Sequence, residues 1–335
     1  MRATIIGAAG MLGAKLAQQI VNASNLNIEA LTLQDVLLPK APDTTIPCNC
    51  MRGSFTEPEQ AKAIAAERPE LIFHLAAIVS GEAEKDFEKG WAINLHGSLH
   101  LLEALRAQHL ASGGSYRPKV IFTSSIAVFG GPFPDAIDDD FLAAPQTSYG
   151  AQKAMTELAL ADYSRKGFVD GVSLRMPTVV VRPGLPNAAA SSFFSGIIRE
   201  PLAGIEALLP VDDNVRHWFV SPRTATGFLL HAASLDSAKL AGRRSLNLPG
   251  VSCTVAEQIQ ALAGVAGEKC TALIRAQPDA AIIKIIAQWP ERFDATKAEA
   301  LGFVADANFE QIIRVYLEDD APEAVRQATA KESTA

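Results

Sequence analysis

Three evenly spaced glycines directly after an apolar run constrain the fold of this chain more than any other feature. The segment TIIGAAGMLGAK places Gly7, Gly10 and Gly13 after the run Ala3–Ile6 and at the start of a helix-like pattern. This spacing lets the backbone turn sharply and approach a pyrophosphate at a helix N-terminus, where free N–H groups and the helix dipole favour anions. The alternative is a tight turn without a ligand. Because the glycines fall at a strand–helix junction, the pattern favours a dinucleotide site.

An acidic residue at the end of the second apolar run indicates which dinucleotide binds. Asp35 lies 22 residues after Gly13, in the segment LTLQD. A carboxylate there accepts hydrogen bonds from both hydroxyls of an adenosine ribose and repels a 2′-phosphate. No arginine follows in VLLPK. The alternative is an ordinary turn residue at a strand end. We therefore predict that the cofactor is NAD rather than NADP.

Short apolar runs alternate with helix-like stretches through the first half of the chain, as is typical of βαβ units and a parallel sheet. The runs are Ala3–Ile6, Ile28–Leu33, Leu71–Leu75, Val120–Thr123 and Val172–Leu174. The helix-like stretches are Met11–Ala23, Glu57–Ala66, Asp86–Gln108 and Tyr149–Ser164. Because the runs are brief and rich in Val, Ile and Leu, we expect strands covered by helices on both faces. The predicted fold class is α/β, with a Rossmann-type doubly wound parallel sheet.

The pattern changes after Pro177, where prolines and glycines break the chain into short pieces. A chain of 335 residues is too long for a typical single core. We therefore predict an NAD-binding Rossmann domain over residues 1–176, rejoined by about 212–236. A smaller, irregular α/β substrate-binding domain is expected over residues 177–335.

Composition excludes several classes of function. A net charge of −7 and the lack of a basic run argue against a nucleic-acid partner. The chain has no run of 18 uncharged apolar residues, so we expect no membrane span. Its four cysteines form no C-x-x-C pair and no disulfide-like framework, which fits a reducing cytoplasm.

Two groups of residues raise the question of a metal site. Cys48 and Cys50 form half of a cysteine-type site, but no second pair lies near them in the sequence. His96, His100 and Glu103 would share one helix face, and an ordinary solvated or interfacial surface is the favoured interpretation. We expect no metal.

The segment SYGAQK supplies a pair with catalytic chemistry. Tyr149 and Lys153 lie four residues apart at the start of a helix-like stretch, so their side chains share a face. An ammonium beside a phenol favours the tyrosinate and lowers the pKa of the phenol, which would make Tyr149 a general base for an alcohol proton. The strand segment KVIFTSSIAVFGG places Ser125 at the carboxyl edge of the sheet, where open α/β sheets bind ligands. The alternative is a pair on an ordinary helix surface.

Taken in order, GAAGMLG, Asp35, HLAA at 74–77, Asn94 in INLHGS, TSSIAVFG and YGAQK resemble the extended short-chain dehydrogenase/reductase family. This family includes nucleotide-sugar epimerases and dehydratases. The resemblance implies Ser125, Tyr149 and Lys153 as catalytic residues, and a homodimer through helices around 86–108 and 149–165. The cofactor-binding residues that it implies, together with those of the glycine turn, are Gly7, Gly10, Met11, Leu12, Gly13, Asp35, Ser54, Leu75, Ala76, Ala77, Asn94, Tyr149, Lys153, Pro177 and Val179.

The segment LRMPTVVVRPGLPN departs from the nucleotide-sugar enzymes, because Thr178 stands where they carry an asparagine that holds their substrate. This segment, SSIAVFGGPFP and VRHWFVSPRTA are similar to a branch of the family that oxidises the C2 hydroxyl of a four-carbon sugar acid, D-erythronate. Such a substrate requires a cation for its carboxylate and short polar groups for its hydroxyls. The candidate substrate-binding residues are Ser80, Ser125, Tyr149, Thr178, Arg182, Asn187 and Arg216, with Ser191, Ser192 and Arg223 as further candidates.

Two other functions remain open from the sequence. The first is a nucleotide-sugar 4-epimerase or dehydratase, in which tightly bound NAD is reduced and reoxidised within one cycle. The second is a non-catalytic protein that senses NAD on the same fold. The presence of both Tyr149 and Lys153 argues against the second.

Overall fold

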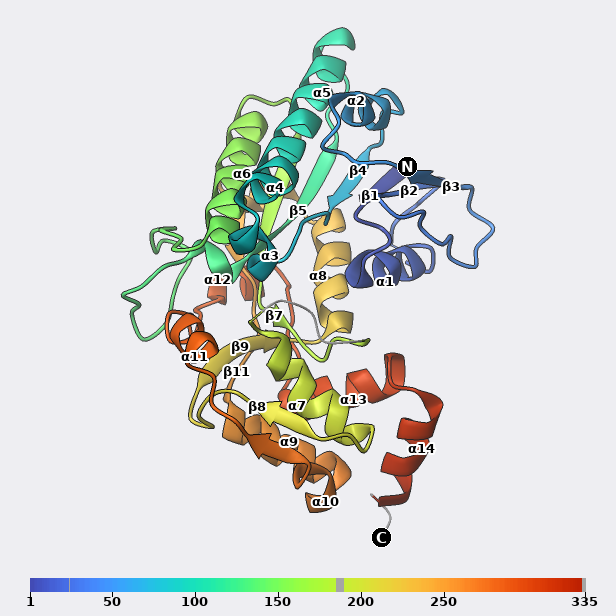
Figure 1. The fold of residues 1–335 in the computed structure, drawn as a ribbon. Coiled ribbons are helices and arrows are strands. Elements are labelled where there is room, and N and C mark those ends of the chain that lie inside the picture. The colour runs from blue at the N-terminus through green and yellow to red at the C-terminus, as the bar shows by residue number, and fades with distance from the viewer. Residues whose placement is uncertain (24, 185–189, 333–335) are drawn as a thin grey trace.

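A parallel seven-stranded sheet forms the larger part of the molecule (Figure 1). The computed structural model describes residues 1–23, 25–184 and 190–332. The strand order is β10-β6-β5-β4-β1-β2-β3, so the direction of winding reverses between β1 and β4. Ligands of such sheets bind outside the carboxyl ends of the strands at this reversal. The strands are β1 (Arg2–Ile6), β2 (Ala30–Asp35), β3 (Cys48–Arg52), β4 (Leu71–His74), β5 (Lys119–Ser125), β6 (Asp170–Met176) and β10 (Ser245–Asn247).

Helices cover both faces of this sheet, and this confirms the predicted fold class. One face packs against α1 (Met11–Ile20) and α8 (Pro222–Ser234), and the other against α2 (Pro58–Ala66), α5 (Gly97–Ala111) and α6 (Ser148–Arg165). The central strands are apolar on both faces because both are covered. For example, Ile5 and Ile6 project to opposite faces of β1 and are both fully buried. Each such side chain contributes roughly 1.5–3 kcal/mol to folding.

The expected helix over 86–108 is divided. It consists of α4 (Phe87–Gly90), a π-helical turn η1 (Trp91–His96) and α5. The short α3 (Ser80–Lys85) precedes it. A π-helical turn changes the direction in which side chains project and is frequent at functional sites.

The rest of the chain forms a smaller part, below the sheet in Figure 1, with its own apolar core. It contains a three-stranded sheet, β11-β9-β7, and a two-stranded sheet, β12-β8. Its α9 begins with a capping box, in which Thr254 and Glu257 each bind the other's backbone N–H. The strands are β7 (Thr178–Val179), β8 (Ala207–Leu209), β9 (Arg216–Val220), β11 (Val251–Thr254) and β12 (Ile274–Ala276). The remaining helices and 3₁₀ turns of the described chain are η2 (Ile126–Val128), α7 (Ser192–Leu202), η3 (Ser237–Leu240), α9 (Val255–Ala266), α10 (Glu268–Thr271), α11 (Ala280–Ile286), α12 (Thr296–Ala300), α13 (Phe309–Asp319) and α14 (Glu323–Glu332).

The two parts exchange segments of chain. Strand β9 pairs with β7 and β11 in the smaller part, whereas α8, directly after it, returns to the large sheet beside α1. The last strand of the large sheet, β10, follows later still. The domain boundaries proposed from the sequence, at 176 and about 212–236, stay a prediction.

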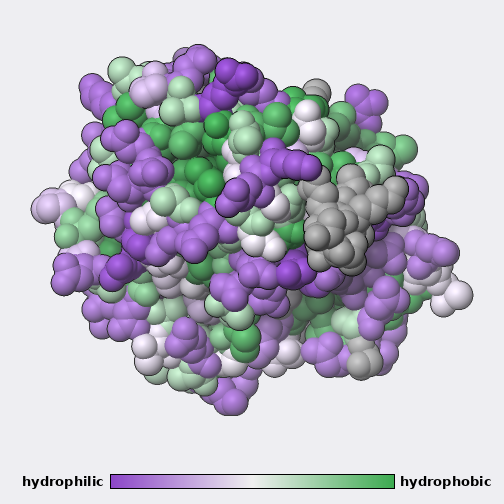
Figure 2. All heavy atoms as spheres, turned by 90° about the horizontal axis from the view of Figure 1, so that it is seen from below, coloured by the Kyte–Doolittle hydropathy of each residue, from purple (hydrophilic) through white to green (hydrophobic). Residues whose placement is uncertain are grey.

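Polar side chains cover most of the face that Figure 2 views from below, and apolar atoms show there in patches and hollows. Among the described residues, no helix is both long enough and apolar enough to span a bilayer.

Two helix glycines provide a test of the packing that holds the glycine turn. A Cβ added at Gly13 in α1 would lie 2.1 Å from Gly7 O, whereas a Cβ at Gly264 in α9 would meet no atom within 4 Å. In urea unfolding without ligand, Gly13→Ala should therefore lose roughly 1–3 kcal/mol through overpacking. Gly264→Ala should gain about 0.5–1 kcal/mol from the helix preference of alanine. Equal effects of the two substitutions would contradict this account of the turn.

Candidate active site

The glycine turn brings the end of β1 against the end of β4. Gly7 has φ +93°, and a Cβ there would lie 2.6 Å from Ala76 N. The backbone N–H groups of Leu75 and Ala76 donate to Ile6 O at 2.8 and 3.0 Å. The exposed Gly10 is the N-cap of α1 and provides no side-chain cap for the first turn. The free N–H groups of that turn form an anion site, which fits a pyrophosphate.

Asp35 is held beside this turn. Its Oδ2 accepts from Ala9 N at 2.9 Å, and its Oδ1 accepts from Leu37 N at 3.3 Å. The backbone of the neighbouring strand reaches the same place, because Gly53 N donates to Asp35 O at 2.9 Å. Ser54 follows Gly53, so the carboxylate and a hydroxyl lie where the adenosine end of a dinucleotide is expected. The residues present therefore fit NAD.

Asn94 acts on the loop after β4. Its Oδ1 accepts from Ile78 N at 2.9 Å, and its Nδ2 donates to Gln152 Oε1 at 2.8 Å. Asn94 is buried within the π-helical turn η1. Its side chain thus ties the loop to α6, and it does not line the cavity described next.

A cavity of about 1530 Å³ lies between the carboxyl edge of the large sheet and the smaller part of the molecule. Fourteen residues singled out in the sequence line it: Met11, Leu12, Leu75, Ala77, Ser80, Ser125, Tyr149, Lys153, Pro177, Thr178, Val179, Arg182, Ser191 and Ser192. The candidates outside its lining are Gly7, Gly10, Gly13, Asp35, Ser54, Ala76, Asn94, Arg216 and Arg223. Asn187 lies outside the described residues.

The start of α6 is fixed against the turn that follows β5. Thr147 caps the helix by accepting from Gly150 N at 3.1 Å. A Cβ at Gly150 would lie 2.1 Å from Ala127 O, so only glycine allows this approach. The Ser125 side chain thereby lies near the Tyr149 phenol, where it favours the tyrosinate form. Strand β5 and helix α6, far apart in the sequence, thus bring two hydroxyls together at the cavity.

The electrostatics of this pair differ from the sequence-based expectation. Burial raises the pKa of Tyr149 to about 12, and the hydrogen bond from Ser125 and the charge of Arg182 oppose that rise. Burial also lowers the pKa of Lys153 to about 7, with Glu157 opposing. Lys153 Nζ donates to Thr123 O at 2.8 Å and lies 5.6 Å from the centre of the Tyr149 ring. The expectation that Lys153 lowers the pKa of the phenol is therefore wrong, because burial dominates and Lys153 is not among the groups that lower this pKa.

The three candidate arginines have different surroundings. Arg182 lines the cavity, where its Nη2 donates to Ser191 Oγ at 2.9 Å. No carboxylate of the described chain forms an ion pair with it. Arg216 instead pairs with Glu257 at 3.1 Å, and Arg223 forms ion pairs on the surface with two acidic residues of α13. Of the three candidate arginines, Arg182 is thus the one that lies in the cavity and is available to a carboxylate.

Sequence reasoning missed part of the cavity wall. His217 in β9, and Trp289 and Pro290 after α11, line the cavity opposite the large sheet. The exposed Lys284 of α11 lies there too. No local motif marks these residues, because the pairing of β9 with β7 and the return of a distant segment bring them to the cavity.

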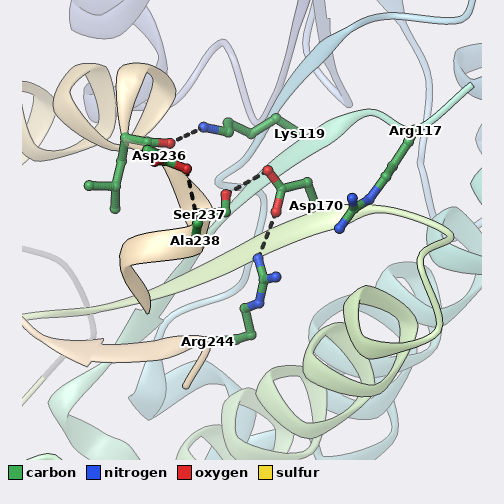
Figure 3. A pocket seen from close by; sticks show the side chains of 8 residues that line it. Arg117, Lys119, Asp170, Asp236, Ser237, Ala238 and Arg244 are labelled. Carbon is green, nitrogen blue, oxygen red and sulfur yellow. Dashed lines mark hydrogen bonds and ion pairs between the residues drawn. The ribbon is translucent and has the colours of Figure 1, made fainter. Parts of the chain in front are cut away.

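A second cavity of about 470 Å³ lies at the amino ends of β5 and β6, away from the glycine turn (Figure 3). Charged side chains that line this cavity bind neighbouring protein groups. Arg244 Nη1 lies 2.6 Å from Asp170 Oδ1, and Lys119 Nζ donates to Leu235 O after α8. These contacts tie the end of α8 to the sheet.

Two of the residues considered for metal binding have other partners. His100 Nδ1 donates to Thr56 O at 2.9 Å, and Glu103 pairs with Arg106 at 2.8 Å. Within the described chain, no group of three or more His, Cys, Asp or Glu side chains is placed to hold a metal ion.

Comparisons with known proteins identify the family of this chain. Residues 3–238 match the model of the NAD dependent epimerase/dehydratase family. The chain is 44% identical over 326 residues to a D-erythronate dehydrogenase of Cupriavidus necator, covering 95% of this chain and 98% of the relative. It is 42% identical over 322 residues to a D-erythronate dehydrogenase of Haemophilus influenzae, covering 96% of this chain and all of the relative.

A solved structure from Agrobacterium tumefaciens, described as a nucleoside-diphosphate-sugar epimerase, has a TM-score of 0.92 and 51% identity. It covers 95% of this chain, which covers 94% of that structure. An L-threonine dehydrogenase of Clostridium difficile has a TM-score of 0.83 at 20% identity and shares the fold. The chain therefore belongs to the NAD dependent epimerase/dehydratase family, and it is an NAD-dependent oxidoreductase.

Proposed function

We propose that this enzyme oxidises the C2 hydroxyl of D-erythronate with NAD and forms 2-dehydro-D-erythronate. The observation that carries the proposal is that the Tyr149–Ser125 hydroxyl pair and Arg182 line one cavity. A hydroxyl pair suits an alcohol, and a guanidinium without a carboxylate partner in the described chain suits the carboxylate beside that alcohol. The two relatives named D-erythronate dehydrogenase match over nearly the whole chain and support this substrate.

Several groups of this chain would hold the cofactor. The first turn of α1 would bind the pyrophosphate, and Asp35 would accept from the adenosine ribose hydroxyls. Lys153, whose amine already reaches Thr123 O at the cavity, would bind the nicotinamide ribose. NAD, when bound, supplies the acceptor for the hydride that leaves C2.

The side chains around the substrate would divide the remaining work. Arg182 binds the carboxylate and so places C2 against the hydroxyl pair. Tyr149, as tyrosinate, takes the proton of the C2 hydroxyl, and Ser125 donates to the oxygen as it becomes a carbonyl. The positive charge of Arg182 favours the tyrosinate against the effect of burial.

The leading alternative is a nucleotide-sugar 4-epimerase or dehydratase, which the solved structure at 51% identity favours by its description. The two reactions differ in the fate of the cofactor. Excess NAD with D-erythronate should give a steady rise in NADH absorbance. A flat trace, together with turnover of a nucleoside-diphosphate sugar, would support the epimerase instead.

We also infer that the enzyme is a cytoplasmic homodimer that pairs through α5 and α6. Large apolar side chains on these helices support a partner, because Leu158 is 72% exposed and Leu110 is 56% exposed. None of the four cysteines forms a disulfide, which suits a reducing compartment. Light scattering of the purified enzyme at twice the mass of one chain is the expected result.

Replacing the proposed base provides the first kinetic test. Tyr149→Phe should lower kcat for D-erythronate by roughly 100- to 10,000-fold, because the proton acceptor is lost. NAD binding, measured by calorimetry, should be nearly unchanged. Tyr116→Phe is a matched control, since the Tyr116 hydroxyl bonds Pro69 O away from the cavity. Near-normal turnover by Tyr149→Phe would contradict the proposed role.

Replacing the proposed carboxylate partner provides the second test. Arg182→Gln should raise KM for D-erythronate roughly 10- to 100-fold, since a charge-assisted hydrogen bond is lost. The charge of Arg182 also lowers the pKa of Tyr149, so its removal raises that pKa. The acid limb of kcat/KM against pH should therefore move to higher pH in this variant.

The control is Arg223→Gln, which removes a surface arginine whose ion pairs lie on α13. It should leave both KM and the pH profile unchanged. If Arg182→Gln behaves like this control, the carboxylate is held elsewhere.

A further inference from the structure

A buried hydrogen-bond relay begins at the cavity wall and runs into the smaller part of the molecule. Thr178 Oγ1 lies 2.6 Å from His217 Nε2, and His217 Nδ1 lies 3.1 Å from Pro290 O. Thr178 and His217 come from the neighbouring strands β7 and β9. All three residues line the cavity. The Thr178 hydroxyl at the cavity is therefore connected through the His217 ring to the backbone carbonyl of Pro290.

The direction of this relay follows from what each atom can do. A carbonyl oxygen only accepts, so His217 Nδ1 carries the hydrogen that points to Pro290. Burial lowers the pKa of His217 to about 4, so the ring is neutral at neutral pH and its Nε2 carries a lone pair. Nε2 therefore accepts, and Thr178 donates its single hydroxyl hydrogen to it.

Aromatic neighbours hold the imidazole in this orientation. His217 is only 1% exposed. Its ring stacks on Phe194 with centroids 5.4 Å apart and packs edge-on to Phe219 at 5.3 Å. Trp289 covers it at 5.1 Å. A flipped ring would leave Pro290 O without its donor, so the packing and the hydrogen bond favour the same orientation.

We infer that Thr178 presents only an acceptor to the cavity and selects a substrate hydroxyl beyond C2. This inference rests on the proposed function. Thr178 has already given its hydrogen to His217, so a hydroxyl of the sugar acid can donate to it, whereas a carbonyl or carboxylate there would face a lone pair.

The same polarity orients the substrate. Arg182 offers only donors, and Thr178 offers only an acceptor, on the wall of one cavity. A sugar acid has a carboxylate at one end and donor hydroxyls toward the other. It can satisfy both groups in one direction, with the acid end at Arg182 and the hydroxyl end at Thr178.

The test compares D-erythronate with its 3-deoxy and 4-deoxy analogues, both of which keep the C2 hydroxyl that is oxidised. For the wild-type enzyme, kcat/KM should fall roughly 10- to 100-fold with one of the two analogues, because Thr178 then lacks its donor. In Thr178→Val the ratio of kcat/KM for D-erythronate to kcat/KM for that analogue should fall to about one, whereas in Thr178→Ser it should stay as in the wild-type enzyme. A role of Thr178 in stability alone would lower activity with all three acids and leave the ratio unchanged.

The relay itself is tested with His217→Phe. This substitution keeps a flat ring among the aromatic neighbours of His217 and removes the Nε2 atom that accepts from Thr178. This variant should also reduce the ratio of kcat/KM between D-erythronate and the analogue. In the double variant with Thr178→Val, the ratio should be no lower than in Thr178→Val alone. A ratio that survives Thr178→Val in an enzyme that oxidises D-erythronate would overturn the inference alone. No oxidation of D-erythronate by the wild-type enzyme would overturn the proposed function and this inference together.

Discussion

The contact between the turn after β1 and the first residues after β4 determines the geometry of the whole site. A side chain at Gly7 would meet Ala76 N at 2.6 Å, and one at Gly13 would meet Gly7 O at 2.1 Å. Hydrogen is the only substituent that fits at either position, so α1 lies close to the sheet and its free N-terminal amides face the carboxyl edge. The loop after β4 is fixed from the other side by Asn94 in the π-helical turn. The glycine turn and the loop after β4 therefore lie side by side at the cavity.

Burial favours the uncharged forms of three side chains that line the cavity. It raises the pKa of Tyr149 to about 12 and lowers that of Lys153 to about 7, and both shifts favour the uncharged forms. It likewise keeps His217 neutral, with a pKa of about 4. Arg182 remains as a fixed positive charge beside the phenol.

The sequence predicts those parts of the fold and site that depend on neighbouring residues. The glycine spacing, the alternating elements and the pair of Tyr149 with Lys153 are local patterns, and the parallel sheet and the cavity position follow from them. Which arginine faces the cavity does not follow from local sequence, because contacts with β11 and α9 hold Arg216 away from the cavity. His217 reaches Thr178 through strand pairing and Pro290 through a segment 73 residues further on. The raised pKa of Tyr149 does not follow from the sequence, because spacing along a helix reports proximity but not burial.

The proposed reaction removes hydride from C2 of a sugar acid and releases it as NADH. The most direct measurement uses D-erythronate that carries deuterium at C2, incubated with excess NAD and followed by NMR. The account predicts deuterium in the accumulated NADH and a carbonyl at C2 of the product. Deuterium that remains on unoxidised D-erythronate, with no labelled NADH, would contradict it.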